Sequence, residues 1–253
     1  MEEKIFYQTK DNIRLCGILS VVNQEKEIAV LCHGLMGDKN DSDHFQDLSS
    51  ALNQSNINTF RFDFRAHGES EGNDFEMTPS KELMDLEASL DMLLERGFKP
   101  TYLLGASFGG VTVSSLNYNY YDSIEKIILW YGLLDFSRVS TFFFTKESEK
   151  EANRDGFKLI QSNRSGITFK LGKNLYQEIK NRKPYETLLE LDIPILFVHG
   201  TLDSVIPYQS SKVFCEKCKN ATLKLIENES HAFRKTKTGL NEAIQATIEF
   251  ILS

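Results

Sequence analysis

Short runs of continuously apolar, often β-branched residues recur along this chain, and amphipathic stretches separate them. Runs such as IAVLC, IILWY and ILFV are typical of strands buried on both faces. Strands that alternate with helices predict βαβ units, and therefore a mainly parallel sheet with helices on both faces. The expected strands span residues 4–9, 13–22, 28–32, 59–64, 102–106, 127–131, 195–199 and 222–226.

The predicted strands are joined by connections of very different length. The first two strands are joined by a tight turn at 10–12, so we expect an antiparallel hairpin at one edge. Leucines at helical spacing predict a helix over 81–96, and residues 238–252 are expected to form a closing helix. The connection from residue 131 to 195 is much longer than the others. Long connections inside a compact domain usually serve function, so we expect a single domain, 1–253, with an inserted cap at 136–184 that lacks its own core.

Composition excludes several classes of protein. The chain has 29 basic and 36 acidic residues, which gives a net charge of −7. A negative net charge disfavours nucleic acids and anionic membranes as partners. The first residues lack the layout of a signal peptide, and no apolar run approaches about 18 residues, so we expect a cytoplasmic protein without integral membrane association. Four cysteines are too few for a disulfide scaffold, and Cys215 and Cys218 are expected to pack on or near a helix. Monomer and homodimer both remain open.

The pattern G-x-S-x-G occurs twice, at 68–72 (GESEG) and at 105–109 (GASFG). A nucleophile elbow needs a strand, a sharp turn that glycines permit, and then a helix. Only the second match has a strand before it and a helix after it. We therefore predict Ser107 as a nucleophile and interpret Ser70 as a solvated loop residue.

A serine hydroxyl needs a base, usually a histidine that a carboxylate orients. Of five histidines, His231 follows the last strand and precedes the last helix, where the order Ser, Asp, His places the base. Two acids compete to orient it. Asp203 follows strand 195–199, and Asp135 follows strand 127–131. We favour Asp203, and expect Asp135 to border the substrate pocket.

Two backbone N–H groups are expected to stabilise the oxyanion of a tetrahedral intermediate. One belongs to Phe108, directly after the nucleophile, and the other to Leu35 in the loop HGLMG after strand 28–32. Their side chains would make the entrance to the site apolar.

These motifs resemble the α/β-hydrolase superfamily over nearly the whole chain. HGLMGDKN, FDFRAHGES, GASFGG, HGTLDSVIP and SHAF occur in the order that the superfamily shows. Within it the sequence looks closest to the feruloyl (cinnamoyl) esterase-like branch, near serine aminopeptidases and monoglyceride lipases. That branch often has Phe and Gln where Leu35 and Phe108 stand here. The resemblance implies a structural role for FDFRAHG, with Asp63 and Arg65 paired below the active site.

The predicted function is hydrolysis of small acyl or aromatic carboxylic esters through an acyl-enzyme. A thioesterase, a monoacylglycerol lipase or a small peptidase could use the same residues, and a ligand-binding receptor without catalysis is the alternative of another class. No metal or cofactor motif is present in the sequence, and a small ester is the expected partner. Phe142, Phe143 and Phe144 either line the substrate pocket or only anchor the cap.

Overall fold

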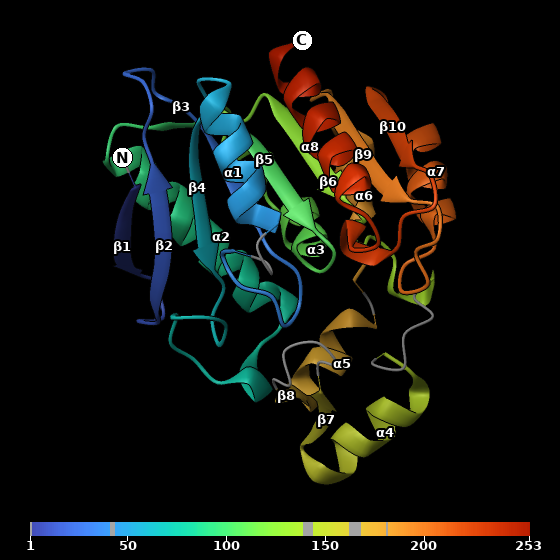
Figure 1. Cartoon of the computed structure of the whole chain (residues 1–253). Coiled ribbons are helices and arrows are strands. Elements are labelled where there is room, and N and C mark those ends of the chain that lie inside the picture. Colours follow the sequence, from blue (N-terminus) through green and yellow to red (C-terminus); the bar gives the residue numbers. More distant parts are fainter. Residues whose placement is uncertain (1, 41–43, 139–143, 162–167, 181) are drawn as a thin grey trace.

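The computed structural model describes residues 2–40, 44–138, 144–161, 168–180 and 182–253. Its centre is an eight-stranded sheet in the order β1-β2-β4-β3-β5-β6-β9-β10 (Figure 1). β1 pairs with β2, and β2 with β4, in antiparallel register, and every other pair in this sheet is parallel. The predicted fold class and edge hairpin are therefore confirmed. The strands span Glu2–Gln8 (β1), Arg14–Ser20 (β2), Glu27–Cys32 (β3), Asn58–Asp63 (β4), Lys99–Ala106 (β5), Lys126–Trp130 (β6), Ile195–Gly200 (β9) and Ala221–Ile226 (β10).

Helices cover both faces of the sheet and bury a separate apolar core on each. On one face lie α1 (His44–Gln54) and α8 (Lys237–Leu252), whose leucines and isoleucines pack on the sheet with Trp130. The opposite face carries α2 (Pro79–Glu95), α3 (Gly109–Ser114), α6 (Tyr185–Glu190) and α7 (Tyr208–Lys217). The helices predicted at 81–96 and 238–252 are thus present. Among the described residues, none of the helices combines the length and apolarity needed to cross a bilayer.

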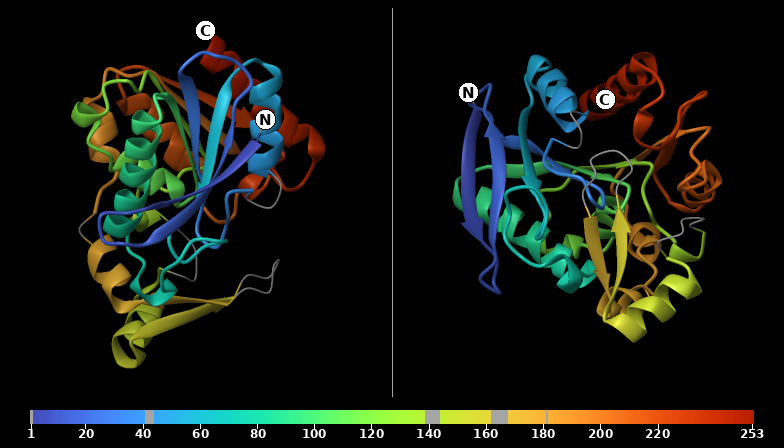
Figure 2. Two further views of the ribbon diagram at one scale, coloured as in Figure 1. Left: turned by 90° about the vertical axis from the view of Figure 1, so that its left-hand side faces the viewer. Right: turned by 60° about the horizontal axis from the view of Figure 1, so that its bottom comes forward.

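The long connection after β6 folds into a small layer of its own. It contains the short helix η3 (Phe136–Arg138), α4 (Lys146–Asp155), the antiparallel pair β7 (Phe157–Gln161) and β8 (Thr168–Gly172), and α5 (Lys173–Ile179). Both views of Figure 2 show this layer projecting from one side of the molecule, beyond the ends of the central strands.

A third apolar cluster joins that layer to the rest of the chain. Ala152, Ile160, Phe169, Leu171, Leu175, Tyr176 and Ile179 pack there with Met77, Phe108, Val111, Leu133 and Ile206. Gly172 lies so close to the loop below that an added Cβ would stand 1.8 Å from the carbonyl oxygen of Phe75. Because its apolar side chains are buried jointly with those of the sheet domain, the inserted layer depends on that domain for its packing.

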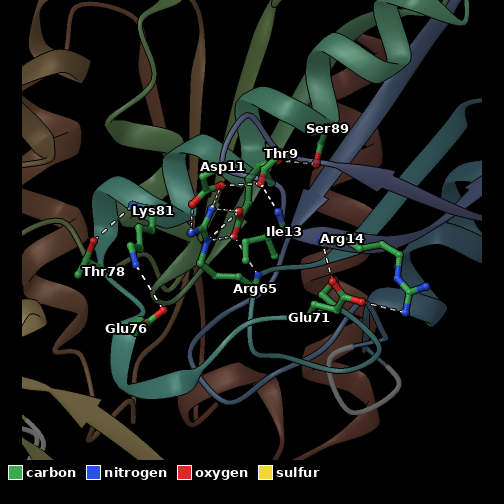
Figure 3. Close-up of polar contacts among 12 residues, drawn as sticks. Thr9, Asp11, Ile13, Arg14, Arg65, Glu71, Glu76, Thr78, Lys81 and Ser89 are labelled. Carbon is green, nitrogen blue, oxygen red and sulfur yellow. Dashed lines mark hydrogen bonds and ion pairs between the residues drawn. The ribbon is translucent and has the colours of Figure 1, made fainter.

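Two buried ion pairs brace the loop FDFRAHG, and they differ from the predicted pair of Asp63 with Arg65. Lys39 Nζ lies 2.7 Å from Asp63 Oδ2, whereas Arg65 binds Asp85 and Asp11. Arg65 donates from Nε and Nη2 to Asp85 Oδ1 at 2.9 and 2.7 Å. From Nη1 it donates to Asp11 Oδ2 at 2.8 Å (Figure 3). The predicted pair was wrong because β4 ends at Asp63 and Arg65 already lies in the turn that follows, where Asp85 and Asp11 are within its reach.

The CxxC cysteines pack at the end of α7, as predicted. Cys215 is half-buried on the helix, and Cys218, just after it, is buried. Burial raises the pKa of both thiols, that of Cys218 to about 11. A raised pKa keeps a thiol protonated and unreactive, which favours a packing role.

Candidate active site

Ser107 stands on the sharp turn between β5 and α3. Its φ of +50° lies in the left-handed region, and its N–H donates to Trp130 O at 3.0 Å. The turn can close because both flanking glycines lack a side chain. An added Cβ at Gly105 would lie 2.7 Å from Gly109 O, and one at Gly109 would lie 2.3 Å from Cys32 O. The strand, turn and helix expected around this serine are all present.

His231 begins the short helix η4 (His231–Phe233) after β10 and faces Ser107. Its Nε2 lies 3.2 Å from Ser107 Oγ, and its Nδ1 lies 2.7 Å from Asp203 Oδ2. The Tyr131 ring packs edge-on against the imidazole, with ring centres 4.8 Å apart. The structure therefore brings together the three side chains that the sequence singled out, from three separate loops.

The carboxylate of Asp203 is fully buried and has a donor on every side. Oδ2 accepts from His231 and from His199 Nε2 at 3.1 Å, while Oδ1 accepts from the N–H groups of Val205 and Ile206 at 2.8 and 2.9 Å. Burial alone would raise the pKa of Asp203, but the hydrogen bonds from His199 and His231 hold it well below its ordinary value. This carboxylate is ionised throughout the range in which a histidine can act as a base.

The competing acid, Asp135, has a different environment. Its Oδ1 accepts from the N–H and hydroxyl of Ser137, at 2.9 and 2.6 Å. The carboxylate that His231 Nδ1 meets is that of Asp203. Asp135 instead lines a cavity, and its place beside the substrate pocket stays a prediction.

The loop that carries Leu35 lies against the nucleophile. A Cβ added at Gly34 would come within 2.9 Å of Ser107 Cβ, so only glycine permits this approach. Among the described residues, the structure gives no backbone acceptor to the N–H of Leu35 or of Phe108. Two N–H groups beside Ser107 are thus available to a ligand oxygen.

Two buried histidines hold that loop, a role that the sequence did not reveal for His67. Met36 N–H donates to His67 Nε2, and Phe64 N–H donates to His33 Nε2, each at 3.1 Å. The two rings pack edge to face, with centres 4.9 Å apart. Burial, and then the neighbouring His33, lower the pKa of His67 to about 3, so it remains a neutral acceptor.

A second brace that the sequence did not predict is Glu229, which is buried two residues before His231. Its carboxylate accepts from Lys235 N–H at 3.0 Å and from Thr236 Oγ1 at 2.5 Å, and its carbonyl accepts from Leu202 N–H at 2.8 Å. It therefore ties the histidine loop to the loop of Asp203. A lone acid in a polar segment looks like a surface residue, so no sequence signal marks it.

A cavity of about 360 Å³ is lined by residues between Asp135 and Tyr185, in the inserted layer and the segment that leads from it to α6. Its apolar wall includes Phe136, Phe144, Tyr176, Ile179 and Tyr185. The ring of Phe108 packs on Phe136 and Phe144 of this wall, with centres 6.1 and 6.3 Å away, whereas Ser107 and His231 are not among the residues that line the cavity. Phe142 and Phe143 lie outside the described residues.

The arrangement offers a hydroxyl, an acceptor nitrogen within hydrogen-bond reach of it and a buried carboxylate behind that nitrogen. It also offers the N–H groups of Leu35 and Phe108, to which the described part of the chain gives no backbone acceptor. This combination suits nucleophilic attack by Ser107 on a carbonyl carbon. In the described part of the chain, no group of three or more His, Cys, Asp or Glu side chains is arranged to hold a metal ion.

Two family models match the chain. One, described as serine aminopeptidase, S33, covers residues 23–146, and another, described as serine hydrolase (FSH1), covers residues 138–241. The uncharacterized protein YfhR of Salmonella typhimurium is 29% identical over 228 residues, which span 83% of this chain and 67% of that protein.

Solved structures share the whole architecture at lower identity. Est1E from Butyrivibrio proteoclasticus, with ferulic acid bound, superposes with a TM-score of 0.79 at 22% identity and covers 98% of each chain. The monoacylglycerol lipase of Paleococcus ferrophilus gives a TM-score of 0.76 at 18% identity, over 95% of this chain and 98% of its own. At these identities the likeness establishes the fold.

Proposed function

Because this chain is a serine hydrolase of the α/β-hydrolase fold, we propose that it hydrolyses carboxylic esters, with Ser107 as nucleophile, His231 as base and Asp203 as orienting acid. The observation that carries the proposal is the unbroken hydrogen-bonded series from Ser107 Oγ through His231 to Asp203, at 3.2 and 2.7 Å.

Each step of the reaction has a group to perform it. Ser107 Oγ attacks the ester carbonyl while His231 Nε2 takes its proton, and Asp203 stabilises the imidazolium that forms. The carbonyl oxygen becomes an oxyanion that the N–H groups of Leu35 and Phe108 bind. His231 then protonates the leaving alcohol. Water repeats the attack on the acyl-enzyme, and the acid leaves.

The cavity beside Phe108 supports a substrate with an apolar or aromatic group. The aromatic part of its wall and a volume of about 360 Å³ suit a small acyl or aryl substituent, and Lys146, Lys180, Arg182 and Lys183 add basic groups to the rest of the lining. Ferulic acid, the ligand in Est1E, is an aromatic acid, and the monoacylglycerol lipase is named for another class of ester. We therefore place aryl esters ahead of thioesters, monoacylglycerols and peptides, which the same three side chains could also cleave.

Covalent labelling provides the test. A fluorophosphonate should label the protein at Ser107, and an aryl acetate should be turned over many times. Ser107→Ala should lose both, with turnover reduced on the order of 10⁶-fold. A protein that binds esters but is never labelled would be a receptor without catalysis.

Ser70 provides the matched control, because it occupies the same position in the other G-x-S-x-G sequence. Its hydroxyl donates to Asp63 O at 2.7 Å and accepts from Cys16 N–H at 2.9 Å, so it is a structural residue and not the solvated one expected. Ser70→Ala should lower the melting temperature and leave labelling intact. Loss of labelling in this variant alone would contradict the assignment of Ser107.

A further inference from the structure

His199, the next to last residue of β9, contacts the acid of the proposed site from behind. Its side chain is fully buried, and Nε2 lies 3.1 Å from Asp203 Oδ2 and 2.9 Å from Ile206 O. The other ring nitrogen, Nδ1, lies 2.8 Å from Ser211 Oγ on α7. The sequence had suggested only that this histidine ends a strand.

The partners determine which nitrogen of His199 carries the proton. Asp203 Oδ2 and Ile206 O can only accept, so Nε2 must be the donor. In the neutral ring Nδ1 is then an acceptor, and the Ser211 hydroxyl donates to it. Ser211 therefore selects the tautomer in which His199 donates to Asp203.

We propose that His199 and Ser211 are positioning residues of the hydrolytic site, which hold the Asp203 carboxylate in the orientation that His231 needs. The inference rests on the proposed function, because it extends the hydrogen-bonded series of Ser107, His231 and Asp203. His199 and Ser211 are its two further members. Oδ2 is shared by the two histidines, and Oδ1 is bound to two backbone N–H groups. With all four donors present the carboxylate cannot rotate away from His231.

His199 reaches no substrate, because its side chain has no exposed surface. Its loss should therefore lower kcat and leave KM unchanged, since substrate binding is untouched and only the orientation of the base suffers. A hydrogen bond to a charged group contributes enough that removing it should reduce kcat about tenfold or more.

Two substitutions at this position separate positioning from packing. The amide of Asn reaches only toward Ser211, so His199→Asn removes the donor to Asp203, whereas the longer amide of Gln reaches the place of Nε2. We expect kcat to fall in His199→Asn and to be largely restored in His199→Gln. Ser211→Ala should give a smaller loss of several-fold. Ser210→Ala is the control. Ser210 is also buried on α7, but the hydroxyl that bonds to His199 is that of the next residue, Ser211.

Proton NMR provides a readout that packing alone would not change. The hydrogen bond from His231 Nδ1 to Asp203 should give a downfield resonance, identified by its loss in Asp203→Asn. His199→Asn should shift or broaden that resonance, and His199→Gln should restore it. Active-site titration with the fluorophosphonate corrects kcat for any unfolded fraction.

Wild-type kcat and an unchanged resonance in His199→Asn would overturn the inference. The inference would also be overturned if His199→Asn and His199→Gln lost kcat equally and in proportion to the fall in their melting temperatures. Failure of the proposed function looks different, because the wild type would then not be labelled by the fluorophosphonate, or Ser107→Ala would retain activity, whatever His199 does.

Discussion

Asp203 and Asp135 are both aspartates in loops after strands of the same sheet, and Asp203 is the one whose Oδ2 lies 2.7 Å from His231 Nδ1. Asp203→Asn should lower kcat by about 10⁴, because an amide facing Nδ1 favours the wrong tautomer of the histidine. Asp135→Asn should instead alter the preference among esters, because Asp135 lines the cavity. Steady-state kinetics with an acetate and a bulky aryl ester measure both effects. A severe fall from Asp135→Asn with a mild one from Asp203→Asn would reverse the two roles.

A second prediction at the scale of single residues concerns His67. His67→Phe keeps a ring against Phe169, whose centre lies 4.9 Å away, but leaves Met36 N–H without its acceptor. The loop that carries the Leu35 donor should then shift, and kcat should fall by up to about 10², as when an oxyanion donor is lost. Leu35→Ala is the control, since it keeps the backbone N–H and should retain most of kcat. A larger loss from Leu35→Ala than from His67→Phe would show that the side chain matters more than the loop.

At the scale of elements, the helices α2 and α3 meet across a buried acid. Glu82 is 1% exposed and accepts from Thr112 Oγ1 at 3.0 Å. Burial, and then the charge of Asp85, raise the pKa of Glu82 well above its ordinary value. The folded protein therefore holds a proton that the unfolded chain releases above about pH 4.3.

The sign of the pH effect follows from that proton. With more protons bound in the folded state, stability falls as pH rises from the unfolded pKa toward the raised one, by at most about 1.4 kcal/mol per pH unit. Glu82→Gln keeps an oxygen for Thr112 and removes the titration. Its free energy of unfolding, measured in urea, should exceed that of the wild type by a margin that grows between pH 5 and 8. A constant margin would show that Glu82 does not titrate in this window.

The elements themselves could be predicted because their signals are local. Continuous apolar runs mark β3, β6 and β9 at the middle of the sheet, and leucine spacing marks α2. Glycines flanking Ser107 and the order of the loops likewise pointed to the site before any contact was known. The partners of Arg65, the tautomer of His199 and the burial of Glu229 depend on which loops meet in space, and no local pattern encodes that. The β7–β8 pair was missed because each strand has only five residues and the pair follows a strongly charged stretch, KESEKEANRD.

On the scale of the whole molecule, the inserted layer shares an apolar cluster with the sheet domain beside the nucleophile. We propose that this layer is a cap that governs selectivity. Phe144→Ala should change the ratio of kcat/KM between a bulky aryl ester and an acetate by about 10–200-fold if the ring contacts substrate. If the ring is only an anchor, the melting temperature should fall and both esters should be affected alike.

Leu159 on β7 offers the control for that experiment. Its side chain is 48% exposed, so Leu159→Ala removes a similar apolar group from the same layer without opening the cluster. Neither the ratio nor the melting temperature should change much. Parallel changes in the two variants would indicate a general loosening of the layer and would remove the argument for contact between Phe144 and substrate. The same assay on Phe142→Ala and Phe143→Ala extends the comparison to the rest of the aromatic run.

The chain contains one tryptophan, Trp130, and it lies at the junction of the parts described above. Its carbonyl accepts the N–H of Ser107 at 3.0 Å, its indole donates to Thr247 on α8 at 2.9 Å, and its ring packs on Phe233 of η4 with centres 5.3 Å apart. The fluorescence of Trp130 is therefore expected to depend on the positions of the elbow, the histidine loop and the last helix. Without any attached dye, the emission of Trp130 should change when Ser107 is acylated and also when α8 leaves the sheet.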